Sequence, residues 1–237
     1  MITLYGFVPS FGLPDPGPFV LKTEVQLKML NLDYRRELNG LLNAPKGRLP
    51  YINDDGTIVA DSTFIRSYLE KTYSVDLDEG FDENQRSFAW TVERLVEDHI
   101  YWTMVYSRWA IDENFAKGPS HFYDGLPEKV QQITRDRSRR NVLSYLHGQG
   151  IGRHSIDEIG DMAARSFTSL SRLLGDKPFL LGNRPCGADA SVFAQIASAL
   201  TPWFESPVRD AAQAHQNLVE YSDRMMVRYY PDFVRES

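Results

Sequence analysis

The sequence predicts a protein of two parts, an α/β domain over residues 1–74 and an all-α domain over residues 84–237. In the first part, short runs that alternate apolar and polar residues, as strands do, stand beside runs whose apolar residues recur at helical spacing. Residues 75–83 contain five acidic residues and one glycine, which is typical of a linker. No strand pattern follows this linker, so we expect the second part to be a helical bundle.

The first strand and the first helix of the α/β domain are separated by a loop rich in proline and glycine. Residues 2–7 alternate between the two faces of a strand. The loop runs from Gly6 to Gly17, and Pro18 stands where a helix can begin, because the first helical residue needs no N–H partner. Apolar residues at steps of four then give this helix one apolar face: Leu21, Val25 and Met29.

Three further strands and a second helix complete this domain. Residues 33–38 are typical of a short edge strand, and residues 49–53 and 57–60 flank an Asp-Gly turn that favours a hairpin. A helix with one apolar face starts near Ser62. The order strand, helix, strand, loop, strand, strand, helix is that of a thioredoxin-like domain, in which helices cover a small mixed sheet.

The second part carries helical signals. Seven residues from Phe88 to Trp109 recur at steps of three and four and predict one long helix. Ser155 and Glu158 form a capping box at the start of another helix. Residues 189–200 are typical of a compact apolar helix.

The composition excludes several classes of protein and site. With 26 Lys+Arg against 32 Asp+Glu, the net charge of −6 argues against nucleic acid as the main partner, since binding phosphates needs a basic face. Cys186 is the only cysteine, so an intrachain disulfide is excluded and a reducing compartment is expected. The five histidines show no paired ligand spacing, so we expect no metal.

Targeting and membrane signals are also missing from the sequence. The N-terminus lacks the basic start and apolar run of a secretory signal. No stretch approaches the ~18 apolar residues of a membrane span. We therefore expect a cytoplasmic protein without a membrane partner.

A ligand-binding group is predicted where a strand-opening proline precedes a helix start. Pro50 opens a strand, and a cis bond there would turn the peptide group of Leu49 toward a ligand backbone. Asp61 and Ser62 follow at a helix N-terminus, where a hydroxyl and unpaired N–H groups attract an anion and a carboxylate attracts an ammonium. Together these groups can hold an α-amino acid, although Ser62 taken alone is as typical of a simple helix cap.

The aromatic residues of the long predicted helix leave two interpretations open. Tyr101, Trp102, Tyr106 and Trp109 cannot all face one way, so some belong to the core and some can wall a pocket that faces the first domain. His99 lies on the apolar stripe of the same helix, which favours a core histidine satisfied by a glutamate or by a backbone group.

Four segments carry a family resemblance that covers nearly the whole chain. They are Pro18–Val25, Pro45–Ile52, Ala60–Ile65 and Glu97–Trp102. In these segments and in the order of its predicted elements, the sequence resembles the glutathione S-transferase superfamily, and within it the bacterial branch related to the failed axon connections and metaxin proteins. The resemblance implies a thioredoxin-like domain that binds glutathione as co-substrate, a helical second domain and a homodimer.

The resemblance also implies how glutathione is held. The backbone before the cis-proline would pair with its cysteinyl part, the acid–serine pair would hold its γ-glutamyl end, and two basic residues lie near enough in the sequence to reach its glycyl carboxylate. These residues are Lys46, Arg48, Leu49, Pro50, Asp61 and Ser62.

Two positions depart from the family pattern. Gly17 stands before a proline where thioredoxin-like members place a nucleophilic Cys or Ser, so thiol–disulfide chemistry is excluded there. Cys186 replaces the usual Ser or Thr three residues before Asp189, and we expect it to be a buried structural thiol. A hydroxyl near the first loop would then stabilise the glutathione thiolate; Ser10 is the candidate and Tyr5 the alternative.

Two functions compete. The leading hypothesis is a glutathione-dependent transferase whose bound thiolate attacks a small hydrophobic electrophile, with cleavage or isomerisation of the electrophile as variants. Its apolar half-site would be formed by Phe11, Leu13, Trp102 and Tyr106. The alternative is a non-catalytic binding module of the metaxin or failed axon connections type, which Gly17 favours and the Asp61–Ser62 pair disfavours.

Overall fold

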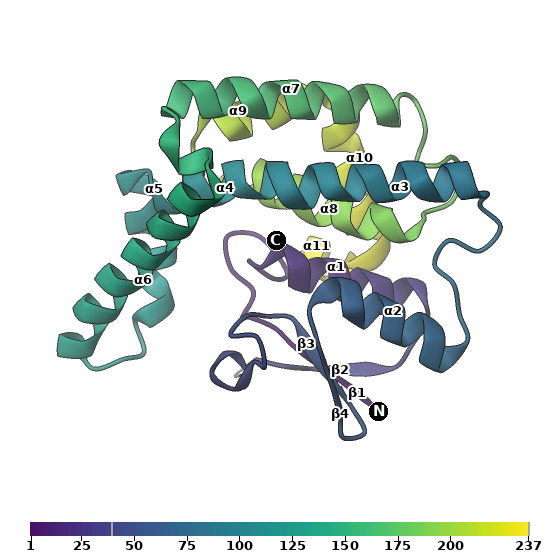
Figure 1. Ribbon diagram of the computed structural model, residues 1–237, viewed down its shortest axis with the longest axis horizontal. Helices are drawn as coiled ribbons and strands as arrows, with labels where there is room; N and C mark the ends of the chain where they lie inside the picture. Colours follow the sequence, from purple (N-terminus) through teal and green to yellow (C-terminus); the bar gives the residue numbers. More distant parts are fainter. Residues whose placement is uncertain (39, 237) are drawn as a thin grey trace.

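Four strands form one mixed sheet in the first part of the chain. The computed structural model describes residues 1–38 and 40–236, and Figure 1 shows the sheet below the helical part. The strands are β1 (Ile2–Tyr5), β2 (Tyr34–Glu37), β3 (Tyr51–Asp54) and β4 (Thr57–Ala60). In the order β2-β1-β3-β4, β1 pairs parallel with β2 and antiparallel with β3, and β3 pairs antiparallel with β4.

The burial of each strand follows its place in the sheet. Ile2 and Leu4 are fully buried because β1 is a central strand. β2 is an edge strand whose residues alternate between half-buried and exposed. The β3–β4 hairpin turns at Asp55 and Gly56, whose φ angles of +46° and +100° are left-handed conformations that an Asp-Gly pair adopts readily.

Two helices cover one face of the sheet. α1 (Pro18–Met29) and α2 (Ser62–Tyr73) contribute Val20, Leu27, Ile65 and Leu69 to a core that they share with the inner residues of β1 and β3. α8 (Gly187–Leu200) packs on α1 from the helical part. α1 is therefore covered on nearly every side, and its polar residues are buried with the apolar ones: Lys22, Thr23, Glu24 and Gln26.

The remaining elements of the described residues are helices. They are η1 (Leu41–Asn43), α3 (Glu83–Leu95), η2 (Val96–Ile100), α4 (Tyr101–Trp109), α5 (Asp112–Lys117), η3 (Pro119–Tyr123), α6 (Glu128–Gln149), η4 (Ile151–Arg153), α7 (Ile156–Leu174), α9 (Pro207–Gln213), α10 (Gln216–Tyr229) and α11 (Pro231–Glu236). The predicted capping box of Ser155 and Glu158 begins α7. The α/β class of the first part and the all-α class of the second are both confirmed.

The long helix predicted from Phe88 to Trp109 is interrupted. α3 ends at Leu95, η2 is a π-helical turn, and α4 continues from Tyr101. A π turn accommodates about one extra residue, so apolar spacings of three and four do not reveal it. Glu97, which lies in this turn, is buried.

The segment between α2 and α3 is fixed by its acidic residues. Asp78 is buried and accepts hydrogen bonds from Arg66 at 2.6 Å and from the N–H of Gly187 at 2.8 Å. Asp76 pairs with Arg86 at 2.7 Å. The acidic pattern that is typical of a linker therefore attaches this segment to both α2 and α8.

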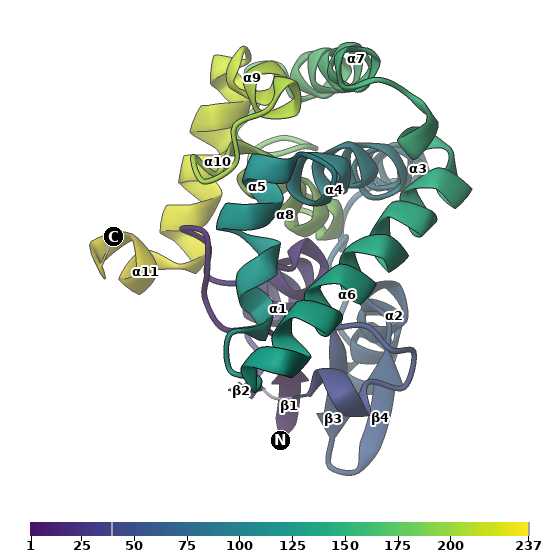
Figure 2. The ribbon, with the colours of Figure 1, turned by 90° about the vertical axis from the view of Figure 1, so that its left-hand side faces the viewer.

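The longest helix, α6, extends from the bundle to the level of the sheet (Figures 1 and 2). It has 22 residues, most of them exposed and many of them charged. No helix within residues 1–38 and 40–236 is long and apolar enough to cross a membrane.

Candidate functional site

A cavity of about 570 Å³ lies between the two parts of the chain. Its walls come from the N-termini of α1 and α2, the loop before β3, the turn η2, and helices α4 and α6. α4 contributes Tyr101, Trp102 and Trp109. All residues predicted to hold glutathione line this cavity: Lys46, Arg48, Leu49, Pro50, Asp61 and Ser62.

The loop before β3 presents the backbone of Leu49 to the cavity. The Leu49–Pro50 peptide bond is cis, the geometry that the family resemblance implies. The N–H and C=O groups of Leu49 have no hydrogen-bond partner within residues 1–38 and 40–236. Both groups are therefore available to an extended ligand backbone.

Asp61 and Ser62 stand at the N-terminus of α2. Asp61 has a φ of +81°, and its Oδ1 accepts a hydrogen bond of 3.0 Å from the N–H of Thr63. Asp61 is thus the helix cap, and the interpretation of Ser62 as the cap is wrong, because Ser62 is already the first helical residue. Ser62 is 4% exposed, and its hydroxyl makes no hydrogen bond within the described residues.

Lys46 and Arg48 carry positive charge at two sides of the cavity. Nζ of Lys46 lies 4.5 Å from the centre of the Phe64 ring on α2. The guanidinium of Arg48 lies 5.5 Å from the centre of the Tyr145 ring on α6. Both basic side chains are exposed, so each can turn toward an anionic ligand group.

Asp15 fixes the N-terminus of α1 beside the cavity. Its buried carboxylate accepts hydrogen bonds from the N–H groups of Phe7 and Gly17, each at 2.8 Å, and from Arg36 at 2.6 Å. Burial raises the pKa of Asp15 to about 7, although these donors oppose the shift. In the first turn of α1, the N–H of Phe19 has no partner within the described residues. The positive end of α1 therefore faces the cavity with a free donor.

The structure does not bring Ser10 or Tyr5 to the cavity. Ser10 lies in a tight turn closed by backbone hydrogen bonds with Leu13, and its hydroxyl donates to the carbonyl of Val8 at 3.1 Å. The ring of Tyr5 stacks on that of Tyr51, with 4.1 Å between the ring centres. The hydroxyl-bearing residues that do line the cavity are Ser62, Thr63, Tyr101 and Tyr145.

The four residues predicted for the apolar half-site are divided among three places. Trp102 lines the cavity, and Phe11 lines a smaller recess beside it. Leu13 is instead buried in the core of the helical part, and the partly buried Tyr106 packs against this core. Leu13 is buried there because the turn that closes on Ser10 directs the chain inward.

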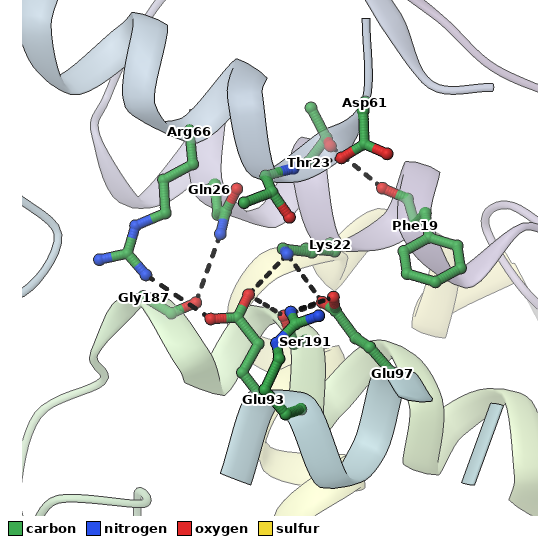
Figure 3. Close-up of polar contacts among 12 residues, drawn as sticks. Phe19, Lys22, Thr23, Gln26, Asp61, Arg66, Glu93, Glu97, Gly187 and Ser191 are labelled. Carbon is green, nitrogen blue, oxygen red and sulfur yellow. Dashed lines mark hydrogen bonds and ion pairs between the residues drawn. The ribbon is translucent and has the colours of Figure 1, made fainter. Parts of the chain in front are cut away.

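A cluster of buried charges lies where α1 meets α3 and η2 (Figure 3). Nζ of Lys22 lies 2.5 Å from the carboxylate of Glu93 and 2.7 Å from that of Glu97, and the Ser191 hydroxyl donates to both. Glu97 also pairs with Arg94 at 2.6 Å, and these two residues line the cavity. Sequence reasoning missed this cluster; its signal was a lysine inside an apolar helix and two glutamates four residues apart.

Cys186 and His99 do not line the cavity, and each is held within the packed helical part. Cys186 is fully buried, as predicted, and burial raises the pKa of its thiol. Nδ1 of His99 lies 3.0 Å from the Ser166 hydroxyl, a side chain of α7, and not from the glutamate or backbone group that the sequence predicted. Burial lowers the pKa of this histidine. Within the described part of the chain, no group of three or more His, Cys, Asp or Glu side chains is arranged to hold a metal ion.

Known proteins resemble both parts of this chain. Models of the glutathione S-transferase N-terminal and C-terminal domains match residues 18–115 and 163–225. The isoprene-epoxide–glutathione S-transferase of Rhodococcus sp. (strain AD45) is 33% identical over 239 residues, which cover 97% of this chain and 99% of that protein. The failed axon connections protein of Drosophila melanogaster is 28% identical over 253 residues, which cover 98% of this chain and 59% of that protein.

Solved structures show the same fold. The beta-etherase LigF from Sphingobium sp. strain SYK-6 superposes with a TM-score of 0.73 at 18% identity, over 100% of this chain and 99% of that one. The mixed sheet and the helical second part agree with these similarities. The chain belongs to the glutathione S-transferase family.

Proposed function

We propose that the protein binds glutathione in the cavity of about 570 Å³ and transfers it to a small apolar electrophile. One observation carries this proposal: the free backbone of Leu49 and the Asp61–Ser62 pair face the same cavity. Both are groups that recognise an amino acid, and a scaffold protein has no need of them.

Each part of glutathione has a complementary group. The γ-glutamyl ammonium would meet the second carboxylate oxygen of Asp61, and the γ-glutamyl carboxylate would meet the Ser62 hydroxyl at the positive end of α2. The cysteinyl backbone would pair with the N–H and C=O groups of Leu49. The glycyl carboxylate would meet Lys46 or Arg48, whose side chains are exposed at the cavity.

The thiol of a glutathione bound in this way would lie near the N-terminus of α1. A free thiol has a pKa of about 8.5, so the site must favour the thiolate. The unpaired N–H of Phe19 and the positive end of α1 act in this direction. The ring of Tyr101 packs edge-on against Phe19, with 4.9 Å between their centres. Burial raises the pKa of Tyr101, although Arg48 and Arg108 oppose the shift, so its hydroxyl stays protonated and can donate.

We therefore propose Tyr101 for the role that the sequence suggested for Ser10 or Tyr5. The electrophile would lie on the aromatic side of the cavity, against Trp102 and Trp109. The Rhodococcus relative is named for isoprene epoxide, a small apolar electrophile. A molecule of this kind suits an aromatic wall.

The alternative function is a binding module without catalysis. It is favoured by Gly17 at the nucleophile position and by the similarity to the failed axon connections protein. The free backbone of Leu49 and the unbonded Ser62 hydroxyl favour the transferase, because both face the cavity without a protein partner in the described residues. A homodimer stays a prediction for either function, and sedimentation analysis would test it.

Titration calorimetry with glutathione tests the proposed function. Asp61→Ala leaves the ligand ammonium without its partner, and a hydrogen bond to a charged group contributes about 1.5–3 kcal/mol. Since about 1.4 kcal/mol is a tenfold change, we expect the dissociation constant to rise at least ~10-fold.

Asp82→Ala is a matched control. Asp82 caps α3 through the N–H of Gln85 at 2.8 Å, as Asp61 caps α2, and it does not line the cavity. Each substitution should destabilise the protein by about 1 kcal/mol, and only Asp61→Ala should weaken glutathione binding. Absence of glutathione binding in the parent protein would favour the module. Equal binding by Asp61→Ala and the parent would place the ligand elsewhere.

A further inference from the structure

A recess of about 190 Å³ lies beyond the N-terminus of α1, between the first loop and α4. It shares Gly17, Tyr101 and Trp109 with the cavity proposed for glutathione. Its walls are aliphatic and aromatic, and among the described residues Arg108 is the one charged residue that lines it. An electrophile that meets a thiolate at the N-terminus of α1 would extend into this recess.

Arg108 is buried there without an acidic partner. It is 6% exposed, and its guanidinium donates hydrogen bonds to the carbonyls of Pro16 at 3.0 Å and Ser198 at 2.8 Å. These bonds use two of the five N–H donors of an arginine. Nε has no hydrogen-bond partner, and Arg108 forms no ion pair within residues 1–38 and 40–236. Burial lowers the pKa of Arg108 to about 10, so the group is charged at neutral pH.

A comparison with Lys22 shows that the burial of Arg108 without a carboxylate partner is unusual in this protein. Lys22 and Arg108 are the two basic side chains that are buried in the described part of the chain. Lys22 has the carboxylates of Glu93 and Glu97 as partners. Arg108 has two backbone carbonyls and two aromatic rings instead, with its guanidinium 5.0 Å from the centre of the Phe204 ring and 6.0 Å from that of Phe11. A buried cation without an anion is unfavourable. An oxygen of a bound molecule that becomes negative in the recess would be the anionic partner that Arg108 lacks.

We propose that Arg108 is a catalytic residue for the opening of a small epoxide in this recess. The inference rests on the proposed function and names its substrate class. A neutral epoxide suits the apolar walls, and negative charge develops on its oxygen only as the ring opens. The interaction with Arg108 therefore strengthens in the transition state, which is the condition for acceleration.

The step balances without any redox partner. The thiol proton of glutathione passes to solvent, and the thiolate sulfur forms a bond to one ring carbon. The bond from that carbon to the ring oxygen breaks, and its electron pair goes to the oxygen. N–H groups of Arg108 donate hydrogen bonds to the alkoxide, which then takes a proton from water. The product is a hydroxyalkyl thioether of glutathione.

Two electrophiles of similar shape separate this role from a structural one. Styrene oxide develops a strongly basic alkoxide when a thiolate attacks it, whereas benzyl chloride releases chloride, a weak base that gains little from a hydrogen-bond donor. We expect Arg108→Met to lower kcat/KM for styrene oxide by ~100–1000-fold, mainly through kcat, on the scale of one lost oxyanion donor. The value for benzyl chloride should change little. Arg108→Lys keeps the charge and should retain part of the epoxide activity.

Arg224→Met is a matched control. Arg224 also donates to a backbone carbonyl, that of Pro178 at 3.1 Å, but on the exposed face of α10. It should leave both reactions unchanged. Should Arg108→Met fail to fold, the ratio of the two activities in Arg108→Lys decides the matter.

Equal losses for both electrophiles would overturn the inference, because they would show that Arg108 only holds the structure. A parent protein that conjugates benzyl chloride but not styrene oxide would overturn the inference and leave the proposed function intact. A parent protein that does not bind glutathione in calorimetry would overturn both.

Discussion

Replacing Lys22 by Met tests whether the buried charge cluster holds the two parts of the chain together. Lys22 on α1 is 1% exposed and lies 2.5 Å and 2.7 Å from the carboxylates of Glu93 and Glu97. Methionine has a similar length but no charge. The variant therefore leaves both carboxylates in place and removes the ammonium between them.

The expected loss in the free energy of unfolding depends on the partners that Glu93 and Glu97 keep in Lys22→Met. Removing one member of a buried ion pair costs about 3–5 kcal/mol. Glu97 keeps Arg94 at 2.6 Å, Glu93 keeps the more distant Arg66 at 3.9 Å, and both carboxylates stay within reach of the Ser191 hydroxyl. We therefore expect a loss near the lower end, about 3 kcal/mol. The loss should shrink at acid pH, because Glu93, left without Lys22, can then take up a proton.

Urea denaturation at neutral pH measures this difference. Lys71→Met, an exposed lysine on α2, is the control and should change the free energy of unfolding by less than about 0.5 kcal/mol. Adding Glu93→Gln and Glu97→Gln to Lys22→Met should restore much of the loss, since the uncompensated charges are then gone. A loss below about 1 kcal/mol for Lys22→Met would refute the reasoning, because it would match only an ordinary hydrogen bond.

Two other predictions concern Tyr101 and His99. Tyr101→Phe should lower kcat with benzyl chloride by ~10–100-fold and leave the affinity for glutathione unchanged. Ser10→Ala should have the kcat of the parent protein. The reverse pattern would show that Ser10, and not Tyr101, stabilises the glutathione thiolate. The pKa of His99 is lowered by burial, so below about pH 6.5 the folded state binds fewer protons than the unfolded state. The free energy of unfolding should therefore fall as pH decreases through this range, and less steeply in His99→Gln. Parallel pH profiles of the two proteins would contradict this assignment.

Local signals in the sequence were sufficient for the sheet and for several residues that line the candidate site. The Asp-Gly turn, the capping box at Ser155 and the proline at the start of β3 each depend on residues a few positions apart. The same is true of Leu49 and the Asp61–Ser62 pair. Whether Asp61 or Ser62 caps α2 depends on the φ angle of Asp61, and a backbone angle cannot be read from the sequence.

Contacts between distant segments could not be predicted in this way. Lys22 and Glu97 are 75 positions apart, and Arg108 and Ser198 are 90 positions apart. The choice between Ser10 and Tyr101 as the hydroxyl at the cavity depended on how the first loop folds back on Leu13. Periodicity shows which face of a helix is buried, but it does not show which element covers that face.

Gly17, just before α1, affects how the protein withstands reactive compounds. Where thioredoxin-like relatives place a reactive side chain, this chain has Gly17, which offers nothing that an electrophile can alkylate. The one thiol of the chain, Cys186, is fully buried at the start of α8, and burial raises its pKa. A thiol with a raised pKa is mostly protonated and reacts slowly. The nucleophilic sulfur would then arrive with each glutathione and leave with each product, so repeated exposure to reactive compounds would not consume a thiol of the protein.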